Sequence, residues 1–208
     1  MPDSFLLPDL IAHSATRSPD ATALTYGKQS LSYAELQAQV EAFASGLRGI
    51  ELQRGERVAI YLEKRFEAVI ASFGTAAAGG VFVPLNPLLK PEQVSYILRD
   101  CNVRVLVTSN ERLSLLTESL VDCHDLLHVV LTNPEPLPAS TWPINRISWS
   151  ALLAAPAQAS HRIIDSDMAA ILYTSGSTGK PKGVVLSHRN TVAGAKSVAT
   201  YLENTAHD

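Results

Sequence analysis

Cysteine is scarce in this sequence, which has only Cys101 and Cys123 among its 208 residues. Two cysteines are too few for a disulfide scaffold, and they lack the paired CxxC spacing that is typical of zinc or redox sites. We therefore expect two reduced thiols in a cytoplasmic protein. Residues 1–9 lack the basic segment of a secretory signal, and Pro8 and Asp9 interrupt their apolar stretch, so we expect no such signal.

An excess of charge of one sign is also absent. The chain has 17 basic and 20 acidic residues, a formal net charge of -3 and no long charged runs. This balance lacks the electrostatic signature of a protein that binds nucleic acid or an anionic membrane surface, and we expect neither partner. With 46% hydrophobic residues, the chain is too apolar to be disordered. Its length suits one large domain or two small ones.

One uncharged stretch, at residues 68–89, reaches the length of a membrane span. It contains Gly79, Gly80, Pro84 and Pro87, which divide it into two short elements. A buried helix followed by a buried strand explains this pattern better than one spanning helix. We therefore expect no integral membrane span.

Helix and strand patterns alternate along much of the chain. Ser32 and Glu35 have the spacing of a capping box at the start of a helix that extends to Gly49. A short helix at residues 10–16 and a hairpin around Gly27 precede it. Beyond it, short apolar runs predict strands, and the segments between them predict helices. The predicted strands are 57–61, 81–84, 103–107 and 127–131, and the predicted helices are 67–78, 91–99 and 111–120.

This alternation favours an α/β fold in which a mainly parallel sheet is layered with helices. Residues 133–160 differ because they contain five prolines and several small residues. We expect an irregular surface connection there.

The segment that carries chemistry follows this connection. Residues 168–174 and 184–186 predict two strands, and Ser187 caps a helix that runs to about residue 202. The loop between the strands reads Ser-Gly-Ser-Thr-Gly-Lys-Pro-Lys-Gly at residues 175–183. Its small residues let backbone N–H groups approach an anion, its hydroxyls donate hydrogen bonds, and its two lysines supply positive charge. This composition is typical of a polyphosphate clamp.

Two common phosphate-binding motifs do not fit the loop. A Walker A sequence ending at Lys180 would require glycine in place of Thr174 and a hydroxyl residue in place of Pro181. The dinucleotide fingerprint has a different glycine spacing and leads into a helix, whereas this loop leads into a strand. A flexible Ser/Gly-rich hairpin loop is the structural alternative, although ordinary hairpins need only about two to five loop residues.

Three further patterns are weaker. His124, Asp125 and His128 approximate the HExxH zinc motif, but His128 falls in a predicted strand, so we expect no metal site. His188 could orient a loop hydroxyl, although a structural position in the first turn of its helix explains it better. No nucleophile elbow surrounds Ser175, so we reject a catalytic triad there.

The loop and its flanks resemble the signature of the AMP-forming adenylating enzymes: acyl-CoA synthetases, adenylation domains of peptide synthetases, and luciferases. The matching residues are 173–184 and 186–190. Upstream segments follow the family's order as well, so the resemblance covers the whole chain; they are 31–36, 55–60, 77–87 and 97–100. More narrowly, residues 83–91 with 100–108 are similar to acyl-CoA ligases associated with bacterial exosortase systems.

The resemblance implies that the complete protein activates a carboxylic acid with ATP and Mg²⁺ and releases pyrophosphate. The acyl group then passes from acyl-AMP to a thiol such as that of coenzyme A, or to the thiol of an acyl carrier. The resemblance also implies that Lys180 and Lys182 offset the charge of departing pyrophosphate, with Lys182 as the catalytic residue. The residues that it implies for holding the nucleotide phosphates are Thr174, Ser175, Gly176, Ser177, Thr178, Gly179, Lys180 and Lys182.

The family's later motifs do not occur in these 208 residues. They are the segment around adenine and magnesium, the ribose-binding aspartate and the catalytic lysine of a carboxy-terminal domain. We therefore expect residues 1–208 to form part of the amino-terminal large domain of a longer ligase, with its phosphate-binding loop at 173–183 and no activity alone. An incomplete sheet exposes an edge and favours self-association. The competing hypothesis is a naturally truncated, non-catalytic association module with the same partial fold.

Overall fold

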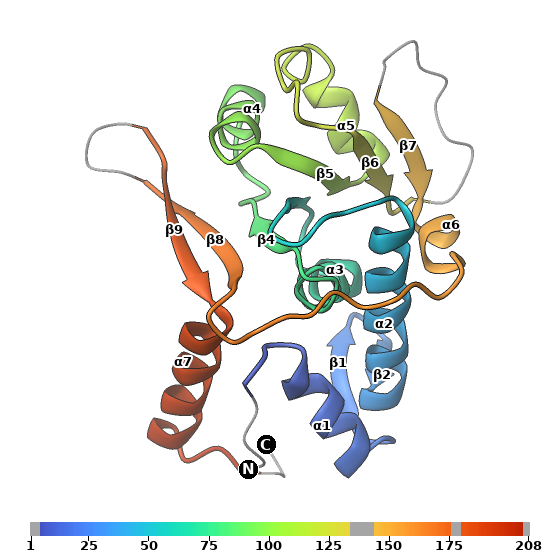
Figure 1. Cartoon of the computed structure of the whole chain (residues 1–208), viewed down its shortest axis with the longest axis vertical. Coiled ribbons are helices and arrows are strands. Elements are labelled where there is room, and N and C mark those ends of the chain that lie inside the picture. Colours follow the sequence, from blue (N-terminus) through green and yellow to red (C-terminus); the bar gives the residue numbers. More distant parts are fainter. Residues whose placement is uncertain (1–4, 134–143, 176–179, 206–208) are drawn as a thin grey trace.

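The computed structural model describes residues 5–133, 144–175 and 180–205. Its main feature is a seven-stranded sheet (Figure 1). The strands are β3 (Arg57–Tyr61), β4 (Val81–Pro84), β5 (Val103–Thr108), β6 (His128–Leu131), β7 (Asn145–Ser148), β8 (Met168–Thr174) and β9 (Lys182–Ser187). Their spatial order is β7-β6-β5-β3-β4-β8-β9. Every neighbouring pair is parallel except β8 and β9, which form an antiparallel hairpin, so the predicted mainly parallel α/β sheet is confirmed.

Helices cover both faces of this sheet, as Figure 1 shows. The remaining elements are α1 (Asp9–Arg17), the hairpin β1 (Thr22–Tyr26) and β2 (Gln29–Ser32), α2 (Tyr33–Gly49), α3 (Phe66–Ala77), α4 (Pro91–Asp100), α5 (Asn110–Leu116), α6 (Trp149–Leu153) and α7 (His188–Tyr201). Along β3, Val58 and Ile60 belong to the core beneath α2 and α3, whereas Ala59 and Tyr61 belong to the core beneath α4 and α5. Burial on both faces explains why the predicted strands are nearly all apolar.

The first long helix, α2, begins as its sequence predicts. The Ser32 hydroxyl accepts from the Glu35 backbone N–H at 3.2 Å, and the Glu35 carboxylate accepts from the Ser32 N–H at 2.8 Å, which completes the capping box. Gly74 then lets α3 approach α2, because a Cβ at this position would lie 2.7 Å from Cδ1 of Phe43. The Phe43 side chain is fully buried at this contact.

The uncharged stretch at residues 68–89 folds as most of α3 followed by β4. Gly79 separates the two elements with a φ of 84°, a left-handed conformation that glycine adopts without strain. The predicted division into a buried helix and a buried strand is therefore confirmed. Among the described residues, no helix is both long enough and apolar enough to cross a bilayer.

The predicted irregular connection at residues 133–160 is wrong in its second half. Residues 145–148 form β7, which pairs with β6 in parallel register, and Ser148 caps the short helix α6. Residues 134–143, which hold four of the five prolines, lie outside the described residues. Because each element is only a few residues long, neither displays the periodicity on which a sequence prediction depends. Strand β7 is defined instead by its parallel pairing with β6.

Candidate functional site

The predicted phosphate-binding loop is carried by the hairpin β8–β9, which extends from the edge of the sheet (Figure 1). Thr174 faces Lys182 across the hairpin, in the last pair before the loop. Thr174, Ser175, Lys180 and Lys182 are all exposed. The predicted ligands Gly176, Ser177, Thr178 and Gly179 lie outside the described residues, so their role stays a prediction.

The two loop lysines are available to an anion. Among the described residues, neither Lys180 nor Lys182 takes part in an ion pair. The hydroxyls of Thr174 and Ser175 stand on the opposite arm from Lys182. Hydroxyl donors and two ammonium groups around one loop have the chemistry to bind phosphate oxygens.

Helix α4 contacts both arms of this hairpin. The Tyr173 hydroxyl donates to Oδ2 of Asp100 at 2.5 Å. The Tyr96 hydroxyl lies 3.4 Å from Oδ1 of Asp100 and 3.4 Å from the carbonyl oxygen of Pro181. Burial, followed by the contact with Asp100, raises the pKa of Tyr173, so its hydroxyl remains a donor at neutral pH.

A glycine on β9 makes room for the Tyr173 ring. A Cβ on Gly183 would lie 2.7 Å from Cγ2 of Ile171 and 3.2 Å from Cζ of Tyr173. Both contacts are shorter than ordinary van der Waals distances. Gly183 therefore serves packing at the base of the loop, in addition to any part it has in the loop itself.

The amino-terminal end of α7 is also anchored. The Ser187 hydroxyl accepts from the Asn190 N–H at 3.1 Å, and Oδ1 of Asn190 accepts from the Ser187 N–H at 3.3 Å. His188 is buried, and its Nδ1 accepts from the backbone N–H of Leu7 at 3.1 Å. This contact supports the structural interpretation of His188 rather than a role beside a loop hydroxyl.

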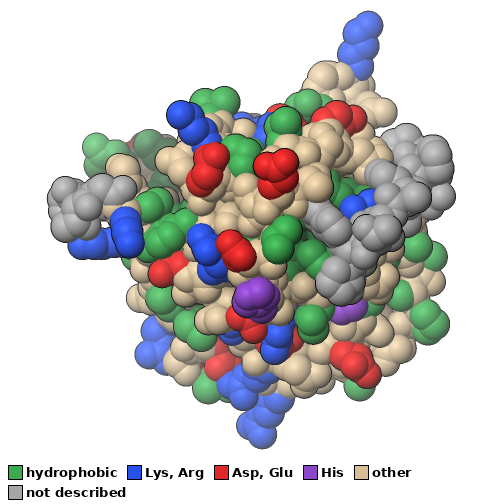
Figure 2. Space-filling view, turned by 90° about the horizontal axis from the view of Figure 1, so that it is seen from above, with side chains coloured by type: hydrophobic (Ala, Val, Ile, Leu, Met, Phe, Trp, Pro, Cys, Tyr) green, Lys and Arg blue, Asp and Glu red, His purple; other side chains and the backbone are tan. Residues whose placement is uncertain are grey.

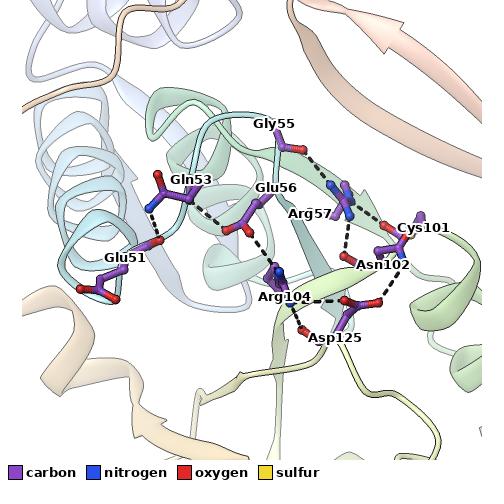
Figure 3. Close-up of polar contacts among 9 residues, drawn as sticks. All are labelled: Glu51, Gln53, Gly55, Glu56, Arg57, Cys101, Asn102, Arg104 and Asp125. Carbon is purple, nitrogen blue, oxygen red and sulfur yellow. Dashed lines mark hydrogen bonds and ion pairs between the residues drawn. The ribbon is translucent and has the colours of Figure 1, made fainter.

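A polar cluster at the start of β3 and β5 accounts for the segment that approximates a zinc motif (Figure 3). Asp125 accepts from Nδ2 of Asn102 at 2.8 Å and from Nη1 of Arg104 at 3.3 Å. His128 is the first residue of β6, so His124 and His128 do not share a helix turn. Among the described residues, no group of three potential metal ligands comes together.

An apolar pocket of about 600 Å³ lies away from the loop. Its walls come from β1, α3, β4 and α7 and include Leu24, Phe66, Phe73, Phe82 and Thr191. None of the predicted phosphate ligands that the structure describes contributes to it. We assign it no part in the candidate site.

The sequence did not indicate the three residues that join α4 to the hairpin at the base of the loop: Tyr96, Asp100 and Tyr173. One signal was available, because Asp100 is the last residue of α4. A carboxylate at a helix carboxyl terminus opposes the helix dipole. Residues that break such a local rule are candidates for another role.

The sheet is mainly parallel and ends in an antiparallel hairpin with a hydroxyl- and lysine-rich loop. Together with the solved structures that this chain resembles, these features define the class as the adenylate-forming enzymes, and the chain matches a part of their large domain. The model of the AMP-binding enzyme family matches residues 11–208, and the chain belongs to that family.

Relatives include both peptide synthetases and ligases. The chain is 34% identical to bacitracin synthase 1 of Bacillus licheniformis over 203 residues, which are 97% of this chain and 3% of that protein. A solved anthranilate CoA ligase, AuaEII with anthranoyl-AMP, matches 94% of this chain and 37% of its own at 26% identity and a TM-score of 0.81. VinN with 3-methylaspartate matches 97% of this chain and 52% of its own at 28% identity and a TM-score of 0.78. The chain thus spans about half of these proteins or less, and these matches lend no support to the narrower resemblance to exosortase-associated ligases.

Proposed function

We propose that residues 1–208 supply the phosphate-binding part of a ligase that activates a carboxylic acid with ATP. In the first step a carboxylate oxygen attacks the α-phosphorus, the bond from that phosphorus to the β-phosphate oxygen breaks, and acyl-AMP and pyrophosphate form. In the second step a thiol attacks the acyl carbonyl carbon and AMP leaves. The observation that carries this proposal is the exposed hairpin loop with Thr174, Ser175, Lys180 and Lys182.

The role proposed for Lys182 follows from where charge develops. Negative charge grows on pyrophosphate as it leaves, and a fixed ammonium group stabilises that charge more in the transition state than in the ground state. Lys182 begins β9 and faces Thr174, so the paired strands fix its backbone. We propose it as the catalytic residue of this loop, with Lys180 and the hydroxyls of the loop as phosphate ligands.

Magnesium would accompany ATP as a counter-ion to its phosphates. Because no cluster of potential metal ligands occurs among the described residues, we assign no protein ligand to it. The adenine, ribose and acyl pockets are likewise not assigned to these residues, and we expect the isolated 208-residue chain to be inactive.

We propose coenzyme A as the thiol acceptor, because the solved relative AuaEII is a CoA ligase and matches this chain with a TM-score of 0.81. The alternative acceptor is a carrier-protein thiol. The 34% identity to bacitracin synthase 1 favours that alternative and an amino acid substrate. The two acceptors distinguish an acyl-CoA ligase from an adenylation domain of a peptide synthetase.

The competing class, a non-catalytic association module, is supported by the free edge of the sheet. Among the described strands, β9 stands at one end of the sheet, and Val184 and Val185 on it are 46% and 53% exposed. Unpaired edge strands with apolar side chains favour association, and we propose that the 208-residue chain self-associates. Figure 2 shows basic and acidic side chains mixed on the face that it displays, and the absence of a nucleic-acid partner stays a prediction. A cytoplasmic location stays a prediction.

Carboxylate-dependent exchange of labelled pyrophosphate into ATP tests the catalytic proposal. The complete protein should catalyse exchange with one class among fatty, aromatic and amino acids, and residues 1–208 alone should not. Product analysis with coenzyme A or with a phosphopantetheine-bearing carrier protein then identifies the acceptor. A complete protein with no exchange for any of these acids would contradict the ligase proposal and leave the association module as the better account.

A further inference from the structure

We propose that Asp100 is a positioning residue for the phosphate-binding loop. Its carboxylate holds the Tyr173 hydroxyl and thereby fixes the direction in which β8 enters the loop. This inference rests on the proposed function of that loop, and it adds a residue from a different part of the chain to the site.

Both carboxylate oxygens of Asp100 face tyrosine hydroxyls. Oδ2 accepts from Tyr173 at 2.5 Å, and Oδ1 lies 3.4 Å from the hydroxyl of Tyr96. A short hydrogen bond to an ionised acceptor is among the stronger polar contacts in proteins. Because the Tyr96 hydroxyl has one proton and two acceptors at 3.4 Å, Asp100 and the carbonyl oxygen of Pro181 compete for it. The Tyr173 contact is therefore the principal one.

The position of Asp100 is unfavourable for α4 itself. It is the final residue of the helix, where the partial negative charge of the helix dipole repels a carboxylate. Arg99, the preceding residue, has the charge that suits this end. A carboxylate placed against the dipole brings no benefit to the helix, so its contact with the hairpin is the better explanation for it.

The end of α4 is held in place by the sheet. The Arg57 guanidinium, at the start of β3, donates from Nε to the carbonyl oxygen of Cys101 and from Nη2 to that of Asn102, the latter at 2.8 Å (Figure 3). Asn102 adopts a φ of 50°, the left-handed conformation that commonly ends a helix. Asp100 thus projects from a fixed point on the core sheet toward a hairpin at its edge.

These contacts meet the hairpin directly at the base of the loop. Tyr173 immediately precedes Thr174, the first proposed phosphate ligand, and Pro181 immediately precedes Lys182, the proposed catalytic residue. Ligand-binding geometry must be held to a fraction of an ångström for efficient phosphoryl chemistry. Since Asp100 is exposed, removing its charge should disturb the loop more than it destabilises the fold.

The test uses the complete protein, of which residues 1–208 are a part, with three single substitutions. Tyr173→Phe removes only the hydroxyl, and Asp100→Asn removes only the charge. Asp165→Asn is the matched control, because it also removes the charge of a carboxylate that pairs with a neighbour. Asp165 is half-buried, precedes β8 and accepts from Arg189 at 2.8 Å. Each variant is measured by amide hydrogen exchange over residues 174–183, by thermal unfolding, and by steady-state pyrophosphate exchange with separate kcat and KM for ATP.

We expect faster hydrogen exchange in the loop and a fall of about tenfold in kcat/KM for ATP in both test variants, the scale of one hydrogen bond to a charged group. The KM for the carboxylic acid should not change, and the melting temperature should match that of Asp165→Asn. The double variant should be no worse than Tyr173→Phe alone, because without the Tyr173 hydroxyl the side chain at position 100 has no hydrogen bond to that residue left to lose.

Two results would overturn the proposal. The first is loop hydrogen exchange equal to that of the control, and the second is faster loop exchange with ATP kinetics equal to those of the control. If the unsubstituted protein shows no pyrophosphate exchange with any acid, the ligase function fails separately. The hydrogen-exchange comparison alone then decides whether Asp100 and Tyr173 hold the loop.

Discussion

His188 and Leu7 are joined by a hydrogen bond in which the Leu7 backbone N–H donates to Nδ1 at 3.1 Å. The imidazole is only 1% exposed. This bond ties the first turn of α7 to the segment that precedes α1, although the two residues stand 181 positions apart. Because Nδ1 accepts, the neutral ring carries its proton on Nε2. Protonation at Nδ1 would remove the acceptor.

We therefore predict that stability falls as the pH drops below about 6.5, the ordinary histidine value. Burial lowers the pKa of His188, and this effect outweighs the rise in pKa that Asp167, Asp9 and Asp165 would cause. The unfolded chain then binds more protons than the folded chain, and the free energy of unfolding decreases with decreasing pH. Burial lowers the pKa of His128 in the same sense.

Urea unfolding between pH 5.5 and 7.5 measures this effect. His188→Gln should reduce the slope of stability against pH, whereas His124→Gln, at an exposed position, should leave it unchanged. A slope that is the same in His188→Gln as in the unsubstituted chain would show that this contact does not contribute.

Gly183→Ala should destabilise the chain by about 1–3 kcal/mol, the usual cost of overpacking. The added methyl group would lie 2.7 Å from Cγ2 of Ile171 and 3.2 Å from the ring of Tyr173, so these neighbours must shift to accommodate it. Gly194→Ala is the matched control, because nothing lies within 4 Å of a Cβ there. In the middle of α7 it should raise stability by about 0.5–1 kcal/mol. Chemical denaturation of both variants measures whether the free energy of unfolding falls in Gly183→Ala and rises in Gly194→Ala. Equal changes in the two variants would contradict the packing argument.

Lys182→Ala should lower the rate of adenylation in the complete protein by about 10²–10³-fold, the scale for removing one group that stabilises developing charge. Binding of the carboxylic acid should change little, because the charge that Lys182 offsets appears on pyrophosphate. Single-turnover kinetics and titration with the acid separate the two quantities. Lys28→Ala, in the exposed turn between β1 and β2, is the control. Equal losses in rate and in acid binding would contradict the proposed role.

The sequence predicted the features that depend on local patterns. The capping box of Ser32 and Glu35 and the separation of α3 from β4 at Gly79 are visible in neighbouring residues, and both are present. The segment around β7 and α6 was predicted wrongly, because its four-residue strand is defined by pairing with β6. Pairing partners that are distant in sequence leave no periodic signal in a short strand.

The candidate site was likewise predictable only in the part that depends on neighbouring residues. Its loop is identifiable from composition and motif, since small, hydroxyl and basic residues adjoin one another. The residues that contact the base of the loop cannot be identified in this way, because Asp100 lies 73 positions from Tyr173. Only the packing of α4 against the hairpin brings the two together. Gly183 reads as a loop glycine in the sequence, and the ring that it accommodates becomes visible only in the folded hairpin.

The exposed edge of the sheet gives the last prediction, which concerns association of the 208-residue chain. Among the strands that the structure describes, β9 pairs only with β8, so its outer N–H and C=O groups can pair with a second copy. Val185 is 53% exposed on this strand. We expect Val185→Lys to weaken self-association, because charged side chains on an edge strand oppose pairing between edges.

Light scattering over a range of protein concentrations measures the result. The unsubstituted chain should be dimeric or larger, and Val185→Lys should shift it toward the monomer. Val198→Lys provides the control, because it adds the same charge at a 56% exposed position on α7, away from the edge strand. A monomeric unsubstituted chain at high concentration would contradict self-association. Equal weakening by both substitutions would mean that net charge, rather than pairing at β9, governs association.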